Sequence, residues 1–184
     1  VELGAKAYVM EVSSHALKQN RVPVDFDVAI FTNLTRDHLD YHLTMDDYLL
    51  SKQRLFTEHM KHQRDVFAVV NGDDPQVAEV AVAPGVSKLT FGHGDGDFQW
   101  VLRRSSIAGM EFRVTEKNND TFDYESQLVG EHNIYNLVGG IAAARAWGIS
   151  HAVCQRAIKK FAGIPGRLQK VPDPQGRHIF VDYA

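Results

Sequence analysis

The segment NLTRDHLDYH, at positions 33–42, concentrates two carboxylates, two imidazoles, an arginine and an asparagine in ten positions. It follows the apolar run DVAIF at 27–31, which is typical of a strand buried on both faces of a parallel sheet. Ligands of open α/β sheets bind beyond the carboxyl ends of the strands. The segment is therefore a candidate site for a metal ion or an anion.

A second polar cluster, EVSSH at 11–15, ends another apolar run, AYVMEV at 7–12. Because the carboxyl ends of parallel strands share one edge of a sheet, we expect the two clusters to lie on the same rim. The competing interpretation is a pair of capped, solvated loops without function. Either cluster alone fits that interpretation equally well, and two clusters on one rim favour a functional site.

Lys52 is a charged residue at an apolar position of a predicted helix. It lies three or four residues from Tyr48, Leu49, Leu55 and Phe56, and so shares their face. One interpretation is that the aliphatic stem is buried while the ammonium group reaches water. The functional alternative is a lysine whose lowered pKa leaves its amine reactive beside the neighbouring loop.

The segment GEHNIYN, at positions 130–136, places Asn133 and Asn136 three residues apart at the start of another predicted helix. Asparagines at this position commonly cap the helix, and the local pattern favours that structural role. Their carboxamides each offer a donor and an acceptor, which also suits the edge of a purine base.

These residues need a scaffold, and the hydrophobic pattern predicts an α/β fold with a mostly parallel sheet, flanking helices and a small antiparallel hairpin. Alternating polar and apolar residues indicate the hairpin, and glycines close the last two helices. The predicted strands are 7–12, 27–31, 66–70 and 87–91, the hairpin strands are 110–116 and 121–128, and the main helices are 44–60, 133–148 and 150–163.

Composition limits the kinds of partner. The chain has 184 residues, 44% of them hydrophobic, and a net charge of -3 without a basic cluster for nucleic acid or a membrane surface. The single cysteine, Cys154, rules out an internal disulfide framework, and no apolar run reaches the length of a membrane span. We expect a cytoplasmic monomer that binds neither nucleic acid nor membrane.

Five motifs in order give the chain a resemblance to the Mur ligase family. They are MEVSSHAL at 10–17, NLTRDHLDYH followed by SKQRLF, GEHNIYN, GRLQKV at 166–171 and the terminal VDYA. The first two resemble most closely the family members that build the UDP-N-acetylmuramoyl-tripeptide. The resemblance implies that residues 1–163 are most of a central ATP-binding domain. Residues 164–184 would then be a linker and the first strand of a C-terminal domain.

The function implied is ATP-dependent amide formation. Such an enzyme adds the third amino acid, diaminopimelate or lysine, to UDP-MurNAc-L-Ala-D-Glu through an acyl phosphate, in the synthesis of peptidoglycan precursors. The family's phosphate-binding loop, G-x-x-x-x-G-K-[ST], does not occur in these 184 residues. We therefore expect the chain to be inactive by itself.

The resemblance also assigns roles to individual residues. Glu11 and His38 would hold magnesium or manganese, and Lys52 would be carbamylated by carbon dioxide to give an anionic metal ligand. His38 and Lys52 would thus be the catalytic residues. His42 and Asp37 would support this loop.

Other matched positions would bind the substrates. Ser13 and Arg21 correspond to positions that contact the UDP-MurNAc-dipeptide. Asn133 and Asn136 would face the adenine of ATP, Arg167 its phosphates or ribose, and Asp182 the ribose hydroxyls.

Three other functions remain open at this stage. The chain could be another amide ligase of the same superfamily or a nucleotide-binding module without catalysis. It could also be a metallohydrolase that binds zinc through His38 and His42, which are four residues apart as in H-E-x-x-H. Leu39 occupies the place of the glutamate base in that motif, which counts against the hydrolase.

Overall fold

Eight strands and five helices make up the described part of the chain, residues 4–36, 41–60 and 65–183 of a computed structural model. Six strands form one sheet in the order β1-β2-β3-β4-β5-β6, and β7 pairs with β8 in a separate antiparallel sheet. The strands are β1 (Val28–Phe31), β2 (Phe67–Asn71), β3 (Ser87–Gly92), β4 (Phe98–Ser106), β5 (Gly109–Glu116), β6 (Thr121–Ser126), β7 (Gln169–Val171) and β8 (Ile179–Val181). The helices are α1 (Ser14–Lys18), α2 (Met45–Glu58), α3 (Pro75–Ala78), α4 (His132–Ala146) and α5 (His151–Lys160).

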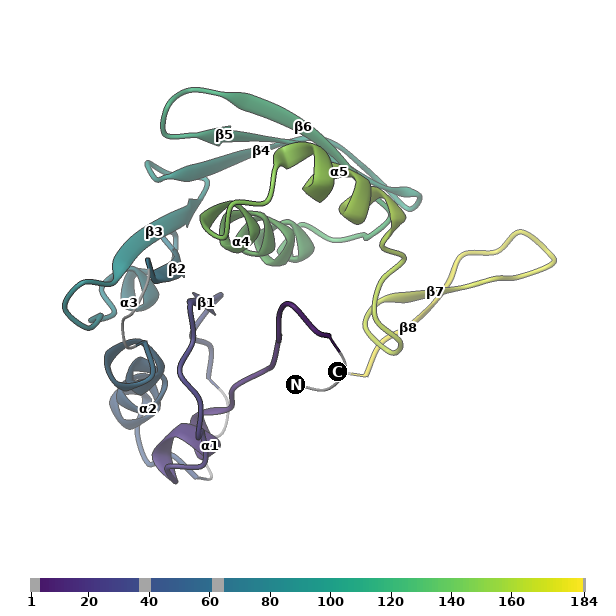
Figure 1. Cartoon of the computed structure of the whole chain (residues 1–184). Coiled ribbons are helices and arrows are strands. Elements are labelled where there is room, and N and C mark those ends of the chain that lie inside the picture. Colours follow the sequence, from purple (N-terminus) through teal and green to yellow (C-terminus); the bar gives the residue numbers. More distant parts are fainter. Residues whose placement is uncertain (1–3, 37–40, 61–64, 184) are drawn as a thin grey trace.

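Helices cover the parallel part of the sheet on both faces (Figure 1). Strands β1 to β4 are parallel, and β4 to β6 continue the sheet as antiparallel neighbours. Helix α4 packs against β1 to β4, α5 packs against β6 and α4, and α3 packs against β2. The predicted α/β class, with a mostly parallel sheet and an antiparallel part, is confirmed.

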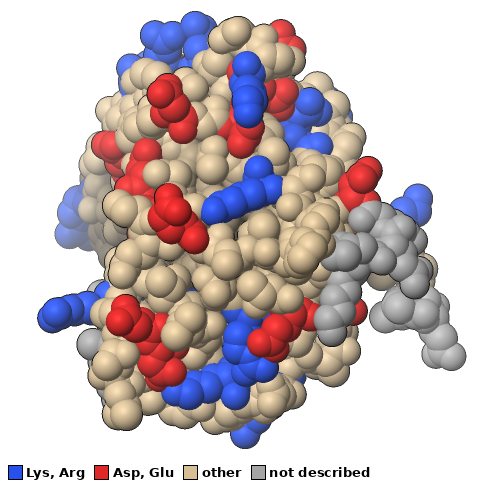
Figure 2. Space-filling view, turned by 90° about the vertical axis from the view of Figure 1, so that its left-hand side faces the viewer, with Lys and Arg blue, Asp and Glu red and all other residues tan. Residues whose placement is uncertain are grey.

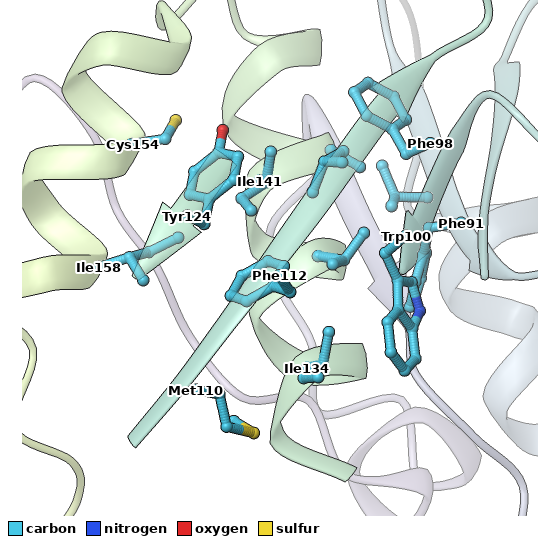
Figure 3. Packing of buried hydrophobic residues seen from close by; sticks show 14 residues of the cluster. Phe91, Phe98, Trp100, Met110, Phe112, Tyr124, Ile134, Ile141, Cys154 and Ile158 are labelled. Atoms are coloured by element: carbon cyan, nitrogen blue, oxygen red, sulfur yellow. The ribbon is translucent and has the colours of Figure 1, made fainter. Parts of the chain in front are cut away.

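The core on the α4 side is rich in aromatic side chains (Figure 3). Trp100 of β4, Phe112 of β5 and Tyr124 of β6 are each about 1% exposed, and the rings of Phe112 and Tyr124 stack 5.4 Å apart. A second buried cluster, on the α2 and α3 side, includes Phe31 and Phe56. Two cores on opposite faces explain why β1 and β2 are continuous apolar runs in the sequence.

The strand predicted at 7–12 is wrong, because the structure contains no strand there. Tyr8 and Val9 are 80% and 93% exposed. Strand β1 lies at the edge of the sheet and pairs only with β2 among the described residues. A strand must pair its backbone groups with a neighbour, and within the described ranges this segment has none.

The predicted helix at 44–60 is confirmed as α2, and its start follows from local chemistry. Thr44 is the N-cap, and its Oγ1 accepts a hydrogen bond from the backbone nitrogen of Asp47 at 3.1 Å. The helices predicted at 133–148 and 150–163 correspond to α4 and α5. Gly148 follows α4 with a φ of +83°, a backbone conformation that glycine adopts without strain.

The hairpin is confirmed as β5 and β6, and a further strand that the sequence pattern did not predict, β4, pairs with β5. Met110, Phe112 and Val114 are buried, as their alternation indicates. β4 changes direction of pairing within the sheet, being parallel to β3 and antiparallel to β5. Its second half, including Arg103 and Arg104, is exposed, so its apolar pattern stops halfway along the strand.

Charges of both signs alternate on the face seen in Figure 2. Lysine and arginine side chains lie among aspartates and glutamates there, in line with the small net charge of the chain. Within the described ranges, no helix combines the length and the apolar character needed to cross a bilayer.

A partly buried polar network joins the antiparallel strands to α4 and α5. Glu116 Oε1 accepts hydrogen bonds from His151 Nε2 at 2.7 Å and from Arg145 Nε at 2.8 Å, and Tyr124 donates its hydroxyl to His151 Nδ1 at 2.5 Å. Burial alone would raise the pKa of Glu116, but these donors lower it below the ordinary value. Burial lowers the pKa of His151.

Replacing Glu116 by alanine is expected to destabilise the protein by about 2 kcal/mol, because Arg145 and His151 then lose the charge that both contact. Urea denaturation followed by the fluorescence of the buried Trp100 measures the loss. Asp123→Ala is the matched control, since it breaks the exposed pair with Arg113 and should cost less than about 1 kcal/mol. Equal losses in both variants would contradict the expectation.

The same network should make the protein less stable in acid. His151 is harder to protonate when folded, so stability declines as the pH falls below its ordinary pKa of 6.5. The lowered pKa of Glu116 adds a further loss below its ordinary value of 4.5. His151→Gln should flatten the dependence between pH 7 and pH 5 in melting curves. If the pH dependence of the melting temperature is unchanged in His151→Gln, other groups cause the loss of stability in acid.

Candidate active site

The two polar clusters of the sequence meet in the structure. Helices α1 and α2 pack against each other (Figure 1), and His42, from the end of the second cluster, lies between them. His42 Nε2 is 2.9 Å from the hydroxyl of Ser14, and its Nδ1 is 3.3 Å from Asp47 Oδ2. The two clusters are therefore close together, but not at the ends of two strands as expected, since no strand precedes the first cluster in the described part of the chain.

His42 supports this junction as a neutral imidazole. Its side chain is fully buried, and burial lowers its pKa although the hydrogen bond with Asp47 acts in the opposite direction. The partners determine the tautomer: Nδ1–H donates to the carboxylate of Asp47, and Nε2 accepts the hydroxyl proton of Ser14. Both ring nitrogens are engaged, which counts against zinc binding at His42.

Lys52 lies on the apolar face of α2, as its spacing indicates. Its Nζ is 4.9 Å from the ring centre of Tyr48 and 5.8 Å from that of Phe31, the last residue of β1. The side chain is half-buried. Lys52 therefore brings its amine to the carboxyl end of β1, where the loop containing the second cluster begins.

Side chains at and just after the end of β2 hold the start of that loop in place. Asn71, which is 6% exposed, donates its Nδ2 to the backbone oxygen of Thr32 at 2.8 Å. Asp74 accepts the backbone nitrogen of Leu34 with Oδ2 at 2.9 Å, while its Oδ1 caps α3. These bonds fix the backbone on both sides of Asn33. The sequence patterns discussed above did not indicate that Asn71 and Asp74 belong to this region.

The predicted metal ligands are only partly covered by the described residues. Glu11 is exposed and lies two residues before Ser13, the N-cap of α1. Asp37, His38 and Asp40 lie outside the described residues. Among those described, no three His, Cys, Asp or Glu side chains gather closely enough to hold a metal ion.

The predicted substrate contacts lie at the two ends of α1. Ser13 is exposed, and its Oγ accepts a hydrogen bond from the backbone nitrogen of Ala16 at 3.2 Å. Arg21 is exposed just beyond the helix, where its backbone nitrogen donates to the carbonyl of Ala16 at 2.8 Å. Both side chains are accessible to a ligand along this helix.

Asn133 and Asn136 differ in their surroundings. Asn133 Nδ2 donates to the backbone oxygen of Val129 at 2.8 Å, so Asn133 has the local structural role that its position at a helix start favours. Asn136 is exposed, and its Nδ2 is 3.4 Å from Asn133 Oδ1. Asn136 is thus the more accessible of the two carboxamides.

Arg167 and the segment carrying Asp182 lie side by side. Arg167 NH1 donates to the carbonyl of Tyr183 at 2.6 Å, and the Tyr183 nitrogen donates to the carbonyl of Gly166 at 2.8 Å. Asp182 itself is exposed directly after β8. The structure brings together two residues that are 15 positions apart and that are both predicted to contact the sugar-phosphate part of ATP.

The fold and these clusters define the class of the chain: an α/β domain with a candidate site at the carboxyl ends of its parallel strands. Residues 1–144 match the family model described as the Mur ligase middle domain. The chain therefore belongs to the Mur ligase family.

Individual relatives are consistent with this membership. The UDP-N-acetylmuramoyl-L-alanyl-D-glutamate--2,6-diaminopimelate ligase of Geobacter sulfurreducens is 43% identical over 194 aligned residues. The alignment covers 100% of this chain and 37% of that ligase, so the chain spans little more than a third of its relative.

Solved structures show the same fold. One described as a UDP-N-acetylmuramoyl-L-alanyl-D-glutamate--2,6-diaminopimelate ligase has a TM-score of 0.78 and 33% identity, covering 94% of this chain and 36% of that one. The MurF ligase of Thermotoga maritima in complex with ADP has a TM-score of 0.69, covering 89% of this chain and 36% of that one. At 18% identity, the latter supports the fold alone.

Proposed function

We propose that the chain is the central part of an ATP-dependent amide ligase that adds diaminopimelate or lysine to UDP-MurNAc-L-Ala-D-Glu. The observation that carries this proposal is the meeting of α1 and α2. It brings Ser14 of the first cluster and His42 of the second next to the helix of Lys52, whose amine lies at the end of β1, and this supports a common site. The match over the whole chain to a ligase named for this substrate supports the same assignment.

The reaction has two steps. The side-chain carboxylate of the substrate's D-Glu attacks the γ-phosphorus of ATP, and ADP leaves to give an acyl phosphate. The amine of the incoming amino acid then attacks the acyl carbon, an amide forms, and inorganic phosphate leaves. Alignment of the reactants and neutralisation of the phosphate charge supply most of the acceleration in such transfers.

Magnesium or manganese would supply that neutralisation, held by Glu11, His38 and a carbamylated Lys52. Magnesium prefers oxygen ligands, and the protonated amine of Lys52 is not one. Carbamylation forms a bond between the neutral amine and the carbon of carbon dioxide and releases a proton, which leaves an anionic carboxylate. The half-buried place of Lys52 beside two aromatic rings, at the rim of the sheet, fits this conversion.

The nucleotide would lie between α4 and the β7–β8 segment in the working enzyme. Asn136, with Asn133 behind it, would face the adenine, Arg167 the phosphates or ribose, and Asp182 the ribose hydroxyls. In this arrangement the asparagines belong to a central domain at 1–163, and Arg167 and Asp182 belong to a linker with the start of a C-terminal domain at 164–184. The separate two-stranded sheet after α5 supports it.

Ser13 and Arg21 would contact the UDP-MurNAc-dipeptide along α1. Their exposure on the helix that packs against α2 supports this role. We place the enzyme in the cytoplasm as a monomer, where ATP and nucleotide-activated sugars are available.

The test uses the full-length protein that contains this chain. It should release phosphate from ATP only when magnesium, UDP-MurNAc-L-Ala-D-Glu and an amino acid are all present, and mass spectrometry should detect the tripeptide product. Diaminopimelate and lysine are tested in parallel. Phosphate release that does not depend on the dipeptide substrate, or the absence of an amide product with either amino acid, would overturn the proposal.

A further inference from the structure

Two side chains of α2 fasten it to α1, and Lys52 lies between them in the sequence. Asp47 stands in the first turn of α2, and Arg54 in its second half. The contacts between the two helices join described residues that are far apart in the chain. They therefore report how the two helices are placed relative to each other.

Arg54 contacts the end of α1 with its guanidinium group. NH1 donates to the backbone oxygen of Leu17 at 2.7 Å, and NH2 donates to Asn20 Oδ1 at 2.5 Å. The carboxylate of Glu58 accepts from Nε and NH2 at 2.8 and 2.7 Å and holds the guanidinium in this orientation. The carbonyl of Leu17, in the last turn of α1, also accepts a hydrogen bond from the backbone nitrogen of Asn20 at 3.1 Å.

Asp47 contacts α1 in two ways. Its Oδ2 accepts from Lys18 Nζ at 2.5 Å, and it also accepts from His42, whose other ring nitrogen reaches Ser14. The hydrogen bond with Lys18 is the main cause of the lowered pKa of Asp47. Asp47 and Arg54 thus both contact the C-terminal end of α1 directly, and Asp47 reaches Ser14, at the N-terminal end, through His42.

We propose that Asp47 and Arg54 are positioning residues that set the distance between the substrate-binding helix α1 and the helix α2 that carries Lys52. This inference rests on the proposed function, which places Ser13 against the UDP-MurNAc-dipeptide. It goes beyond that function by assigning a task to residues that would touch neither substrate nor metal. Releasing α1 should weaken binding of the dipeptide substrate and leave the ATP site on α4 unchanged, because the two sites lie on different elements.

Steady-state kinetics and calorimetric titration of the full-length protein test the proposal. Arg54→Ala should raise the KM and the Kd for UDP-MurNAc-L-Ala-D-Glu roughly tenfold, while the KM for ATP changes less than about twofold. Arg54→Lys should rescue little, because a single ammonium cannot replace a fork that contacts three groups. Asp47→Ala should act in the same direction.

The matched control is Arg113→Ala. Arg113 also donates to a carboxylate through Nε and NH2, at 2.7 and 2.8 Å, but it lies on β5 and is 37% exposed, close to the 28% of Arg54. It should leave both KM values unchanged. The double variant Asp47→Ala/Arg54→Ala should weaken substrate binding by less than the product of the single effects, since both release one helix.

Four outcomes would count against this assignment. The inference would fail, while the proposed function stands, if Arg54 variants behave like the Arg113 variant. It would also fail if they raise both KM values equally with a parallel loss of melting temperature. Fully independent effects in the double variant would show that the two residues do not act on one helix. A parent protein that neither binds nor couples the dipeptide would overturn the proposed function and this inference with it.

Discussion

Under the proposed function, Lys52→Arg is expected to lower the ligase turnover of the full-length protein by roughly 100-fold or more, because a carbamylated Lys52 would supply a metal-ligand oxygen that arginine cannot supply. A guanidinium group stays cationic at neutral pH and does not take up carbon dioxide. Arginine keeps the positive charge and most of the packing beside Tyr48 and Phe31. Loss of activity with a preserved fold would therefore separate carbamylation from the structural role of the side chain.

Lys52→Ala should fold and also lose most of its activity. It removes an amine that lies near two aromatic rings, an interaction of about 0.5–1 kcal/mol, and it relieves the burial of a charged group. Circular dichroism and melting curves would measure the fold, and phosphate release the activity. A small carboxylate such as acetate, added to this variant, should occupy the vacated space and restore part of the rate.

If the stem of Lys52 is only buried and its ammonium group reaches water, the opposite results are expected for these variants. Arginine would then be tolerated, alanine would be mildly destabilising, and turnover would stay near that of the parent. An active Lys52→Arg enzyme would refute the carbamate. Mass spectrometry under native conditions, with and without bicarbonate, offers a second measurement that does not depend on turnover.

The 184 residues alone are expected to show no measurable ATP hydrolysis. Phosphate-binding loops supply backbone amides and a lysine to the β- and γ-phosphates, and no such motif occurs among these residues. Without them the γ-phosphate is neither oriented nor neutralised. A coupled phosphate assay on the purified chain, with magnesium and both substrates, measures this.

The full-length protein under identical conditions is the positive control. A Lys52→Ala version of the short chain identifies any contaminating ATPase, since a contaminant would be insensitive to that change. Turnover by the short chain that disappears in this variant would show that the residues present suffice for phosphoryl transfer. The role given to the missing loop would then be wrong.

The elements that the sequence predicts well are those whose signals are local. The apolar run at 27–31 and the cap at Thr44 are visible within a few residues, and both correspond to observed elements. The apolar spacing around Lys52 likewise places that side chain correctly on its helix. The motifs are enough to indicate the family, since they are short and occur in a fixed order.

Strands whose existence depends on a pairing partner could not be predicted from local sequence patterns. Residues 7–12 have the composition of a buried strand, but a strand exists only where another pairs with it, and here β1 forms the edge of the sheet. Strand β4 was not predicted because its exposed half lacks an apolar pattern. This half is a strand because its backbone pairs with β5.

Local sequence patterns were enough to predict the fold class, the family and the position of Lys52 on its helix. The contacts that hold the candidate site together depend instead on the packing of distant parts of the chain. The bonds from His42 to Ser14, from Arg54 to Leu17 and from Asn71 to Thr32 join residues 28, 37 and 39 positions apart. No periodicity or capping pattern encodes such bonds, because they form only when the packing of both cores brings the helices and strand ends together.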